Sequence, residues 1–250
     1  MENTEREQKI LDILQKCPSV SVKELKRALF ASEATVRRDL VKLEQKGLVI
    51  RTHGKAVSTG IYADKNQGFD LRVNTASPVK RRLAEKAVAL CTHDGAVVFL
   101  DASSTAMQTV DFLSNKKDII VLTSGLKTAV ALSSTNIKFY STGGKAINSS
   151  MSLVGQTAID TVNSFNADVC FVSCHGVSQT GFATDTSELE NDLRKTMLKR
   201  SKRKVLLVDS TKIDSGCWHN LCHLSAFDDV FCDKPLPEEI LKTIKNFHLI

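Results

Sequence analysis

Residues 32–53 read Ser-Glu-Ala-Thr-Val-Arg-Arg-Asp-Leu-Val-Lys-Leu-Glu-Gln-Lys-Gly-Leu-Val-Ile-Arg-Thr-His. Apolar residues recur in this stretch at helical spacing and predict one buried helix face; they are Val36, Leu40 and Leu43. Ser32 is suited to cap the first turn of this helix, and Gly47 is suited to the left-handed residue that follows its last turn. The short β-branched segment 48–51 predicts a strand that leads into a basic turn.

The polar residues of the same stretch predict a surface that contacts DNA. A capped helix, a strand and a basic turn in this order are typical of a winged helix, whose recognition helix enters the major groove. We therefore expect contacts from the start and free faces of the helix and from the turn. The expected DNA-binding residues are Ser32, Glu33, Thr35, Arg37, Arg38, Lys42, Arg51, His53 and Lys55.

The preceding segment completes a helix-turn-helix. Its apolar spacing predicts a helix over residues 3–17, which Pro18 stops. Ser21 and Glu24 have the spacing of a capping box and open a short second helix. The residues of this second helix that we expect to face inward are Leu25, Leu29 and Phe30.

Positive charge is concentrated in the same N-terminal part. Residues 1–57 contain twelve Lys and Arg and eight Asp and Glu, which gives +4 of the chain's formal charge of +6. Such a concentration is the electrostatic signature of phosphate binding. The alternative is a small three-helix bundle whose arginines are merely solvated.

Residues 5–57 resemble the DeoR-type helix-turn-helix of bacterial sugar-operon repressors. The strings that carry the resemblance are Arg6-Glu7-Gln8-Lys9-Ile10, Ser21-Val22-Lys23-Glu24-Leu25, Thr35-Val36-Arg37-Arg38-Asp39-Leu40, Leu43-Glu44 with Gly47-Leu48, and Arg51-Thr52-His53-Gly54. The family usually has two glycines after the histidine. Here Lys55 replaces the second glycine and adds a cation where a DNA phosphate is expected. The resemblance implies a transcriptional repressor.

The length of 250 residues suits one small domain and one of ordinary size. We expect a DNA-binding domain over residues 1–57, a joint over 58–79 and a second domain over 80–250. The chain has no apolar stretch of about 18 residues, and its N-terminus is charged, so neither a membrane span nor a secretory signal is predicted. Seven cysteines without an export signal favour reduced thiols and a cytoplasmic protein.

From residue 80 onward, helical and apolar extended patterns alternate. Repeated strand–helix units predict an α/β domain with a parallel sheet and helices on both faces. The expected strands are 95–101, 118–123, 137–142, 167–173 and 205–209. The expected helices are 80–90, 105–114, 126–133, one near 152–164, 187–200 and 237–246. The basic residues of 194–204 are expected to form a charged outer face.

Small polar residues follow the predicted strands, at the edge where such sheets bind ligands. Hydroxyl side chains and amides at a helix start suit an anion, a lysine adds charge, and an aspartate accepts sugar hydroxyls. These features together indicate a site for a phosphorylated sugar or polyol. The alternative is that each residue is an ordinary cap or turn residue. The expected site residues at the strand ends are Asp101, Ser103, Ser104, Thr105, Thr123, Ser124, Gly143, Gly144, His175 and Lys212.

Residues 78–250 resemble the DeoR-type sensor domain, a relative in fold of ribose-5-phosphate isomerase. The matching strings are Lys80-Arg81-Arg82-Leu83-Ala84, Asp101 to Thr105, Thr142-Gly143-Gly144, Ser152-Leu153-Val154-Gly155, Gly181, and Asp209-Ser210-Thr211-Lys212. The resemblance adds Lys80 and Ser152 to the expected ligand-binding residues. Three positions depart from the family pattern: Ser103 replaces a glycine, Ser124 replaces an amide, and His175 stands where an acidic residue is common.

Two functions remain open at this point. The first is a transcriptional regulator that binds operator DNA and senses a phosphorylated sugar, as a homo-oligomer with an even number of subunits. The second is a sugar-phosphate isomerase with an appended DNA-binding module, in which Asp101, His175 and Lys212 serve as acid and base. The acidic catalytic stretch of related isomerases is absent around His175, which favours the regulator. No cofactor is predicted, and the Cys and His residues at 170–175 and 217–223 lack standard zinc spacing.

Overall fold

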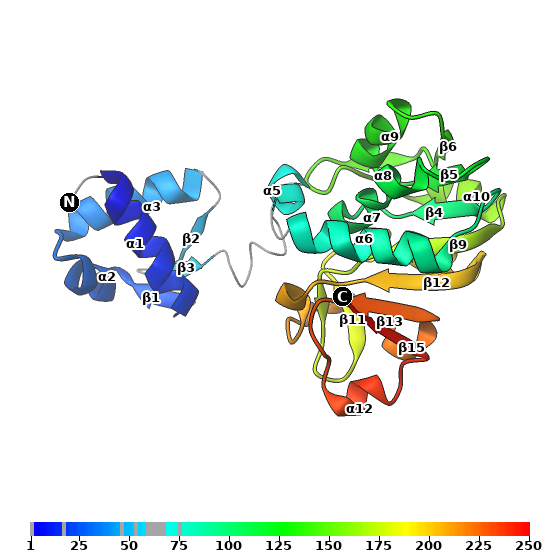
Figure 1. The fold of residues 1–250 in the computed structure, drawn as a ribbon. Coiled ribbons are helices and arrows are strands. Elements are labelled where there is room, and N and C mark those ends of the chain that lie inside the picture. Colours follow the sequence, from blue (N-terminus) through cyan, green and yellow to red (C-terminus); the bar gives the residue numbers. More distant parts are fainter. Residues whose placement is uncertain (1–2, 17–18, 46–47, 53–54, 59–68, 75–76) are drawn as a thin grey trace. The chain divides into compact units, whose positions relative to one another are not determined.

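The computed structural model describes residues 3–16, 19–45, 48–52, 55–58, 69–74 and 77–250. The chain divides into two compact units, Met1–Gln67 and Gly68–Ile250, which we call the N-terminal unit and the C-terminal unit (Figure 1). Among the described helices, none is both long and apolar enough to cross a membrane.

The N-terminal unit packs three helices against a small antiparallel sheet. Its helices are α1 (Asn3–Lys16), α2 (Val22–Leu29) and α3 (Glu33–Gln45). Its strands β1 (Ser19–Ser21), β2 (Val49–Thr52) and β3 (Lys55–Ser58) pair in the order β1-β3-β2. The residues expected on the inner face of α3 are buried, which confirms the winged-helix pattern. The first strand was not predicted, because three residues are too few to show an alternating pattern.

The capping box of α2 is confirmed, but the expected end of its buried face is wrong. The Glu24 amide donates to Ser21 Oγ at 3.2 Å, and the Ser21 amide donates to Glu24 Oε2 at 2.7 Å. Phe30 was expected to face inward, yet it is 97% exposed. It ends α2 in the left-handed conformation, with φ of 49°. The chain turns at this residue, so its side chain leaves the line of the buried helix face.

The C-terminal unit is built on a parallel sheet of seven strands in the described part of the chain (Figure 1). The strand order is β15-β14-β12-β9-β4-β5-β6. The strands are β4 (Val97–Leu100), β5 (Ile120–Thr123), β6 (Lys138–Ser141), β9 (Ala167–Val172), β12 (Ser201–Leu207), β14 (Asp229–Cys232) and β15 (Asn246–Leu249). The predicted parallel α/β sheet is therefore confirmed, with β14 and β15 added at one edge.

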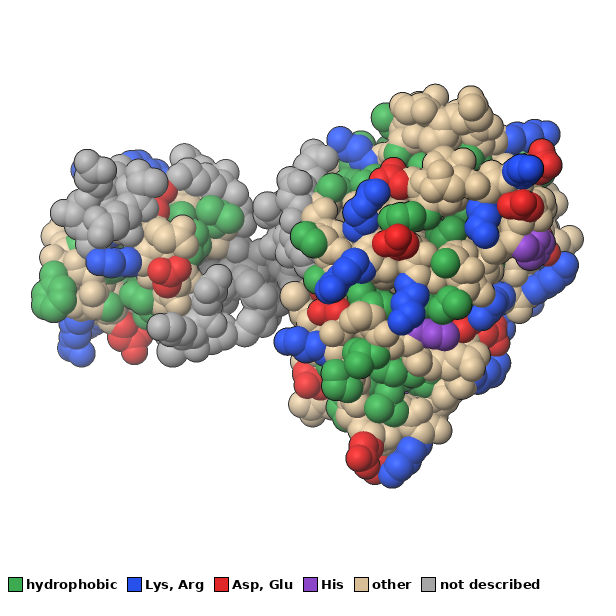
Figure 2. Space-filling view, in the orientation of Figure 1, with side chains coloured by type: hydrophobic (Ala, Val, Ile, Leu, Met, Phe, Trp, Pro, Cys, Tyr) green, Lys and Arg blue, Asp and Glu red, His purple; other side chains and the backbone are tan. Residues whose placement is uncertain are grey.

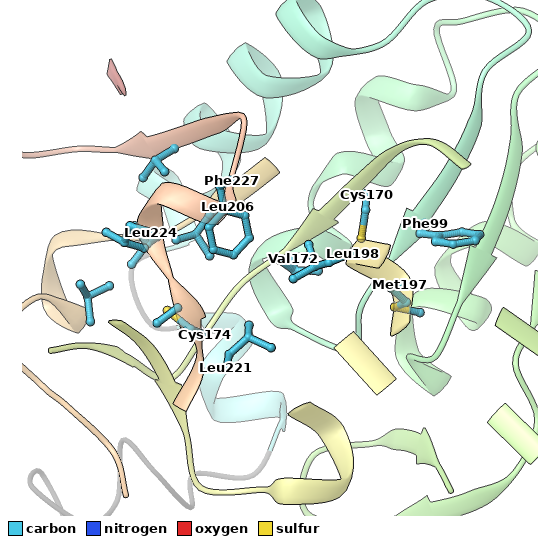
Figure 3. Packing of buried hydrophobic residues seen from close by; sticks show 14 of the residues in the cluster. Phe99, Cys170, Val172, Cys174, Met197, Leu198, Leu206, Leu221, Leu224 and Phe227 are labelled. Atoms are coloured by element: carbon cyan, nitrogen blue, oxygen red, sulfur yellow. The ribbon is translucent and has the colours of Figure 1, made fainter. Parts of the chain in front are cut away.

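Helices cover both faces of this sheet, as expected. One face packs against α6 (Ser77–Cys91), α7 (Ser104–Met107), α8 (Thr109–Leu113) and α9 (Leu126–Ser133). The other packs against α10 (Gln156–Asn163) and α11 (Glu188–Lys199). Figure 3 shows this second core, where Met197 and Leu198 lie near Phe99, Cys170 and Val172. Burial of these apolar side chains supplies the main force that holds the layers together.

A second, smaller sheet packs against the core that contains α10 and α11. Strands β10 (Gly176–Val177), β11 (Phe182–Asp185) and β13 (His219–His223) pair antiparallel. Leu221 of β13 and Leu224 of the following turn η2 (Leu224–Ala226) lie beside Cys174 in the packed cluster (Figure 3). This sheet was not predicted, because its strands are short and interrupted by polar residues.

Three predicted elements need correction. The expected helix 105–114 is two short helices, α7 and α8. The expected helix near 152–164 begins only at Gln156, because residues before it form a hairpin of β7 (Lys145–Ile147) and β8 (Ser152–Val154). The expected helix 237–246 is the single turn α12 (Glu238–Leu241), followed by β15.

The basic run 194–204 is also not one exposed helical face. Arg194 is buried in α11, at 5% exposure. Lys202, Arg203 and Lys204 belong to strand β12, because α11 ends at Lys199. On the face drawn in Figure 2, positive and negative side chains are interspersed over the C-terminal unit. That mixture gives this face no single basic patch of the kind that duplex DNA attracts.

Candidate functional site

The recognition helix α3 starts at a side-chain cap, as predicted. The Thr35 amide donates to Ser32 Oγ at 3.1 Å, and the two hydroxyl oxygens are 2.8 Å apart. The Val36 amide donates to the Ser32 carbonyl at 3.0 Å. Glu33 lies 4.0 Å from Lys26 Nζ, which joins α2 to α3 by a weak surface ion pair. The residues expected to face DNA thus begin at a well-defined helix terminus.

The cations of α3 lie on its free faces. Arg37 and Arg38 are exposed, and Thr35 and Lys42 are partly exposed. The wing is described only as backbone: Thr52 of β2 pairs with Lys55 of β3, and the same hairpin includes Arg51. The expected contact at His53 lies outside the described residues, as do the side chains of Arg51 and Lys55.

Sequence reasoning missed the residue that holds α3 in place. Asp39 is 1% exposed and accepts two hydrogen bonds from Arg6 of α1, at 2.5 Å from Nε and 3.1 Å from Nη2. These bonds raise the pKa of Arg6. A bidentate pair of this kind fixes the angle between two helices. Asp39 is therefore a positioning residue for Arg37 and Arg38.

The second candidate site lies at the carboxyl edge of the parallel sheet. The strands all run the same way, so the residues that follow β4, β5, β9 and β12 meet at one edge. The predicted residues of this edge that are buried are Asp101, Ser103, Ser104, Thr105, Thr123, Ser124 and Ser152. Buried polar groups need partners, so their hydrogen bonds define the site.

Asp101 is the centre of this site. Its Oδ1 accepts from the Ser103 amide at 3.1 Å. Its Oδ2 accepts from the Ser173 amide at 3.3 Å and from Arg194 Nε at 2.9 Å. A carboxylate can accept about four hydrogen bonds, so three are already used.

Arg194 of α11 connects Asp101 to a second buried carboxylate. Its Nη1 donates to Asp185 Oδ2 at 2.6 Å and to Asn191 Oδ1 at 3.2 Å, and its Nη2 lies 4.0 Å from Glu190. Burial alone would lower the pKa of Arg194, but Asp185 and Asp101 reverse that and raise it. Burial opposes ionisation of Asp185 too, yet Arg194 and His175 hold the pKa of Asp185 well below its usual range. Arg194 and Asp185 therefore stabilise each other's charged forms.

Two more predicted residues join the network through single partners. His175 Nδ1 lies 2.8 Å from Asp185 Oδ2. Lys212, in the turn η1 (Ser210–Lys212), donates from Nζ to Ser173 Oγ at 2.9 Å. The structure thus brings the loops after β4, β9 and β12 together, as the sequence predicted.

Lys80 lies at the other side of the same edge. It is 3% exposed, and its Nζ donates to Ser104 Oγ at 3.3 Å and to the Arg72 carbonyl at 2.6 Å. Ser103 Oγ caps α7 by accepting from the Ala106 amide at 3.0 Å. Thr105 is fully buried, and no described residue reaches its hydroxyl with a hydrogen bond. A buried hydroxyl without a partner among the described residues can donate a hydrogen bond to a ligand at this edge.

The remaining predicted residues divide between the pocket and the fold. A small pocket at this edge is lined by Asp101, Ala102, Ser124, Ser152, Leu153, Val154, Glu190, Leu193 and Arg194. Thr123 Oγ1 accepts from the Gly125 amide at 3.0 Å and so shapes the turn below the pocket. Gly143 and Gly144 both have positive φ, and a Cβ on Gly144 would come within 2.5 Å of the Val154 carbonyl. The left-handed backbone explains Gly143, and the left-handed backbone and close packing explain Gly144, without a ligand.

A larger pocket lies at the opposite edge of the sheet, around the starts of β5 and β6. It is lined by Ser114, Lys116, Asp118, Ile119, Ile120, Ser134, Thr135, Asn136, Ile137 and Lys138. Its polar side chains are exposed or half-exposed, and it contains none of the buried network. We therefore place the functional site at the carboxyl edge, where charged groups are buried and held in place.

Sequence reasoning missed six residues of this site: Arg72, Ser173, Asp185, Glu190, Asn191 and Arg194. A signal for Glu190 and Arg194 existed, because their helical spacing places them on the same face of α11 as the apolar residues Leu193 and Met197. Asp185 follows a short strand that shows no pattern, and only tertiary structure brings it to Asp101.

Two family profiles match this chain. The DeoR-like helix-turn-helix domain matches residues 6–60, and the DeoR C terminal sensor domain matches residues 75–234. Both matches agree with the two units that the structure separates.

The chain is also similar to individual proteins. It is 33% identical to the HTH-type transcriptional regulator GolR of Listeria innocua, over 97% of this chain and 95% of that one. It is 31% identical to the L-fucose operon activator of Haemophilus influenzae, over 95% and 94%. Among solved structures, ribose 5-phosphate isomerase A of Methanocaldococcus jannaschii is similar over 56% of this chain and 55% of that one, with 17% identity and a TM-score of 0.42. The chain belongs to the DeoR family of HTH-type transcriptional regulators.

Proposed function

We propose that this regulator binds operator DNA through α3 and the β2–β3 wing, and that a phosphorylated sugar or polyol at the carboxyl edge of the C-terminal sheet controls this binding. The DNA-binding part rests on the exposed Arg37 and Arg38 at a capped helix start. The effector part rests on the buried charges and hydroxyls around Asp101.

One observation carries the effector class. The Lys80 ammonium contacts Ser104, and the next residue, Thr105, has a buried hydroxyl that no described residue engages. A phosphate oxygen can accept hydrogen bonds from both the Thr105 hydroxyl and the Lys80 ammonium. We therefore place the phosphate at Ser104 and Thr105, with Lys80 as its counter-ion and Lys212 approaching the same edge from the other side.

The carboxylates beside this anion position suit the hydroxyl groups of a polyol. Asp101 keeps about one free acceptor position, and Glu190 also lines the pocket. Arg194 balances part of their charge, so a sugar hydroxyl can donate there without a second cation. A relative that is named for the L-fucose operon is consistent with a carbohydrate effector.

We propose that the chain is not an enzyme. This part of the proposal rests on the family, because relatives that match over most of the chain are named as transcriptional regulators. Turnover of aldose phosphates to ketose phosphates by the full-length chain would overturn this part of the proposal.

We propose that the regulator acts in the cytoplasm as a homo-oligomer with an even number of subunits. One winged helix reads one half-site, and two-fold symmetry places two of them on one operator. We expect the C-terminal unit to supply the contact. Light scattering at micromolar concentration checks this, and a monomer that retains full operator affinity contradicts it.

The proposal is tested by operator binding of the full chain, with the operator first selected from a DNA library. Replacing a base-reading arginine by alanine costs about 1–3 kcal/mol and relaxes specificity at one position. We therefore expect the Arg37→Ala/Arg38→Ala variant to lose operator affinity, whereas Arg82→Gln on the exposed side of α6 keeps it. Unchanged affinity in a folded double variant would place the DNA contact elsewhere.

The effector is tested in the same assay with a panel of sugar phosphates. A compound that binds one arrangement of the oligomer more tightly shifts the operator affinity, in either direction. Unphosphorylated sugars at the same concentration are the control. A shift caused equally by the free sugar would contradict a phosphate site.

A further inference from the structure

Helix α5 (Phe69–Asn74) forms one wall of the effector site. It contacts α7, and its Arg72 carbonyl accepts from Lys80 Nζ at 2.6 Å and from Ser104 Oγ at 3.4 Å. On its other side, the Phe69 amide donates to the Ser149 carbonyl at 3.2 Å. The helix therefore bridges the loop that starts α7 and the loop that precedes β8.

The side chain of Arg72 is half-buried, and its hydrogen-bonding groups are only partly used by the described residues. No described residue accepts a hydrogen bond from its buried Nε. Its Nη2 makes one long contact, 3.5 Å, with the Ser150 carbonyl, and its guanidinium lies 5.5 Å from the centre of the Phe69 ring. Burial lowers the pKa of Arg72. A guanidinium that is partly removed from water gains from an anionic partner, so this arrangement suits a bound anion.

Arg194, which is buried, does not have this capacity. Arg194 already donates to Asp101, Asp185 and Asn191. Its charge is thus matched by carboxylates within the protein. Arg72 approaches the same network, because Glu190, Asp185 and Asp101 act on its charge, but it forms no ion pair with them within the described residues.

We propose that Arg72 binds the phosphate group of the effector together with Lys80, Ser104 and Thr105, so that helix α5 is held more firmly when the site is filled. This inference rests on the proposed function and names a residue and an element that carry it out. A planar guanidinium can give two parallel hydrogen bonds to phosphate, which a lysine cannot.

The position of α5 in the chain suggests how phosphate binding at Arg72 can affect the N-terminal unit. It is the first described element after residues 59–68, which connect the C-terminal unit to the strand that ends the wing at Ser58. Effector binding at Arg72 therefore acts on the element through which the chain passes to the N-terminal unit. Ordering of α5 is a route by which occupancy changes the arrangement of DNA-binding units in the oligomer.

Inorganic phosphate is the probe for the test, because the inference concerns the phosphate group alone. The full chain is compared with Arg72→Gln, with Arg72→Lys, and with Arg82→Gln as a control of equal charge change on exposed α6 surface. Phosphate affinity is measured by calorimetry. Amide hydrogen exchange is followed for residues 69–74, with and without phosphate.

We expect phosphate to slow amide exchange in α5 of the full chain and of Arg82→Gln. Arg72→Gln should bind phosphate about tenfold more weakly or worse, since it loses charge-assisted hydrogen bonds. Arg72→Lys keeps the positive charge but lacks the planar guanidinium. Its phosphate affinity should therefore lie between those of the full chain and Arg72→Gln. If Arg72→Gln does not fold, the weaker phosphate binding expected of Arg72→Lys tests the inference instead.

Two other results overturn the inference in distinguishable ways. If Arg72→Gln binds phosphate as tightly as the full chain, Arg72 is not a ligand. If amide exchange in α5 does not respond to phosphate, α5 is not held more firmly when the site is filled. In both cases the inference fails and the proposed function still stands. If the full chain binds neither phosphate nor any sugar phosphate, both the inference and the effector part of the proposed function fail.

Discussion

The two units place the cations of their candidate sites in opposite environments. In the N-terminal unit, Arg37 and Arg38 project from α3 into solvent. In the C-terminal unit, Lys80 and Arg194 are almost completely buried and contact carbonyl, hydroxyl and carboxylate oxygens. Exposed cations attract a duplex from a distance and are weakened by salt, whereas buried cations select one small ligand by shape.

The difference lies in which charges hold the fold and which are left for a partner. The N-terminal unit uses the ion pair of Arg6 with Asp39 to position α3 and leaves Arg37 and Arg38 exposed. The C-terminal unit uses Arg194 to hold two buried aspartates and leaves Arg72 and Thr105 with unused donors among the described residues. In both units, the arginine that is paired with carboxylates holds the fold, and we propose that exposed or partly used donors bind a partner.

The largest effect is expected from removing Arg194. The Arg194→Ala variant leaves Asp101 and Asp185 buried without their partner, which typically costs about 3–5 kcal/mol of the free energy of unfolding. Thermal and urea unfolding should show this loss in the C-terminal unit alone. Lys195→Ala on the exposed side of α11 is the control and should change stability little. Equal stability of the two variants would mean that the buried network does not hold the site.

The same network predicts a dependence on pH. The pKa of Asp185 is lowered in the folded state, so its ionised form stabilises the fold above the unfolded pKa of about 4, and this contribution is lost as the pH falls below that value. Asp185→Asn cannot ionise. The stability difference between the full chain and Asp185→Asn should therefore shrink between pH 6 and pH 3, measured by urea unfolding. A difference that stays constant over this range contradicts the assignment.

In the N-terminal unit the expected effect is smaller, because Arg6 can reach water when its partner is removed. Asp39→Ala should cost about 1.5–3 kcal/mol, the value of hydrogen bonds to a charged group. Operator affinity should fall with it, since α3 loses its anchor. Asp12→Ala removes the same charge from an exposed position of α1 and should leave both quantities near those of the full chain.

The smallest effect concerns Phe30, which holds a left-handed conformation that is unfavourable for a side chain with a Cβ. Its ring is exposed, so little burial is lost on removal. Phe30→Gly should therefore stabilise the N-terminal unit by roughly 1 kcal/mol. Phe30→Ala keeps the Cβ and should show no such gain. If the glycine variant is more stable but binds the operator more weakly, Phe30 is part of the DNA contact.

Local patterns predicted the N-terminal unit well and the C-terminal site only in part. The cap at Ser32, the capping box at Ser21 and the buried face of α3 depend on residues within a few positions of one another, and all three were predicted. The first residues after β4 were also predicted, because a strand followed by small polar residues is a local pattern. Arg72, Asp185 and Arg194 come from three distant elements, and only the folded sheet brings them to Asp101.

Two errors show where local reasoning fails. Arg194 was assigned to an exposed basic face because it precedes a run of lysines and arginines, although its spacing from Leu193 and Met197 placed it inside. Phe30 was assigned to the core because it follows Leu29, although a left-handed residue ends the helix there. Residue type misled both assignments, and backbone geometry corrects them.

The most direct measurement is sugar-phosphate control of operator binding in two matched variants of the full chain. Thr105→Val and Thr92→Val each remove a buried hydroxyl that no described residue engages, with little change of shape; Thr92 follows α6, at the opposite edge of the sheet. Both should bind the operator like the full chain. Only Thr105→Val should need about tenfold more sugar phosphate to change that binding. An unchanged response in Thr105→Val, or an equal loss in both, would contradict an effector site at the carboxyl edge.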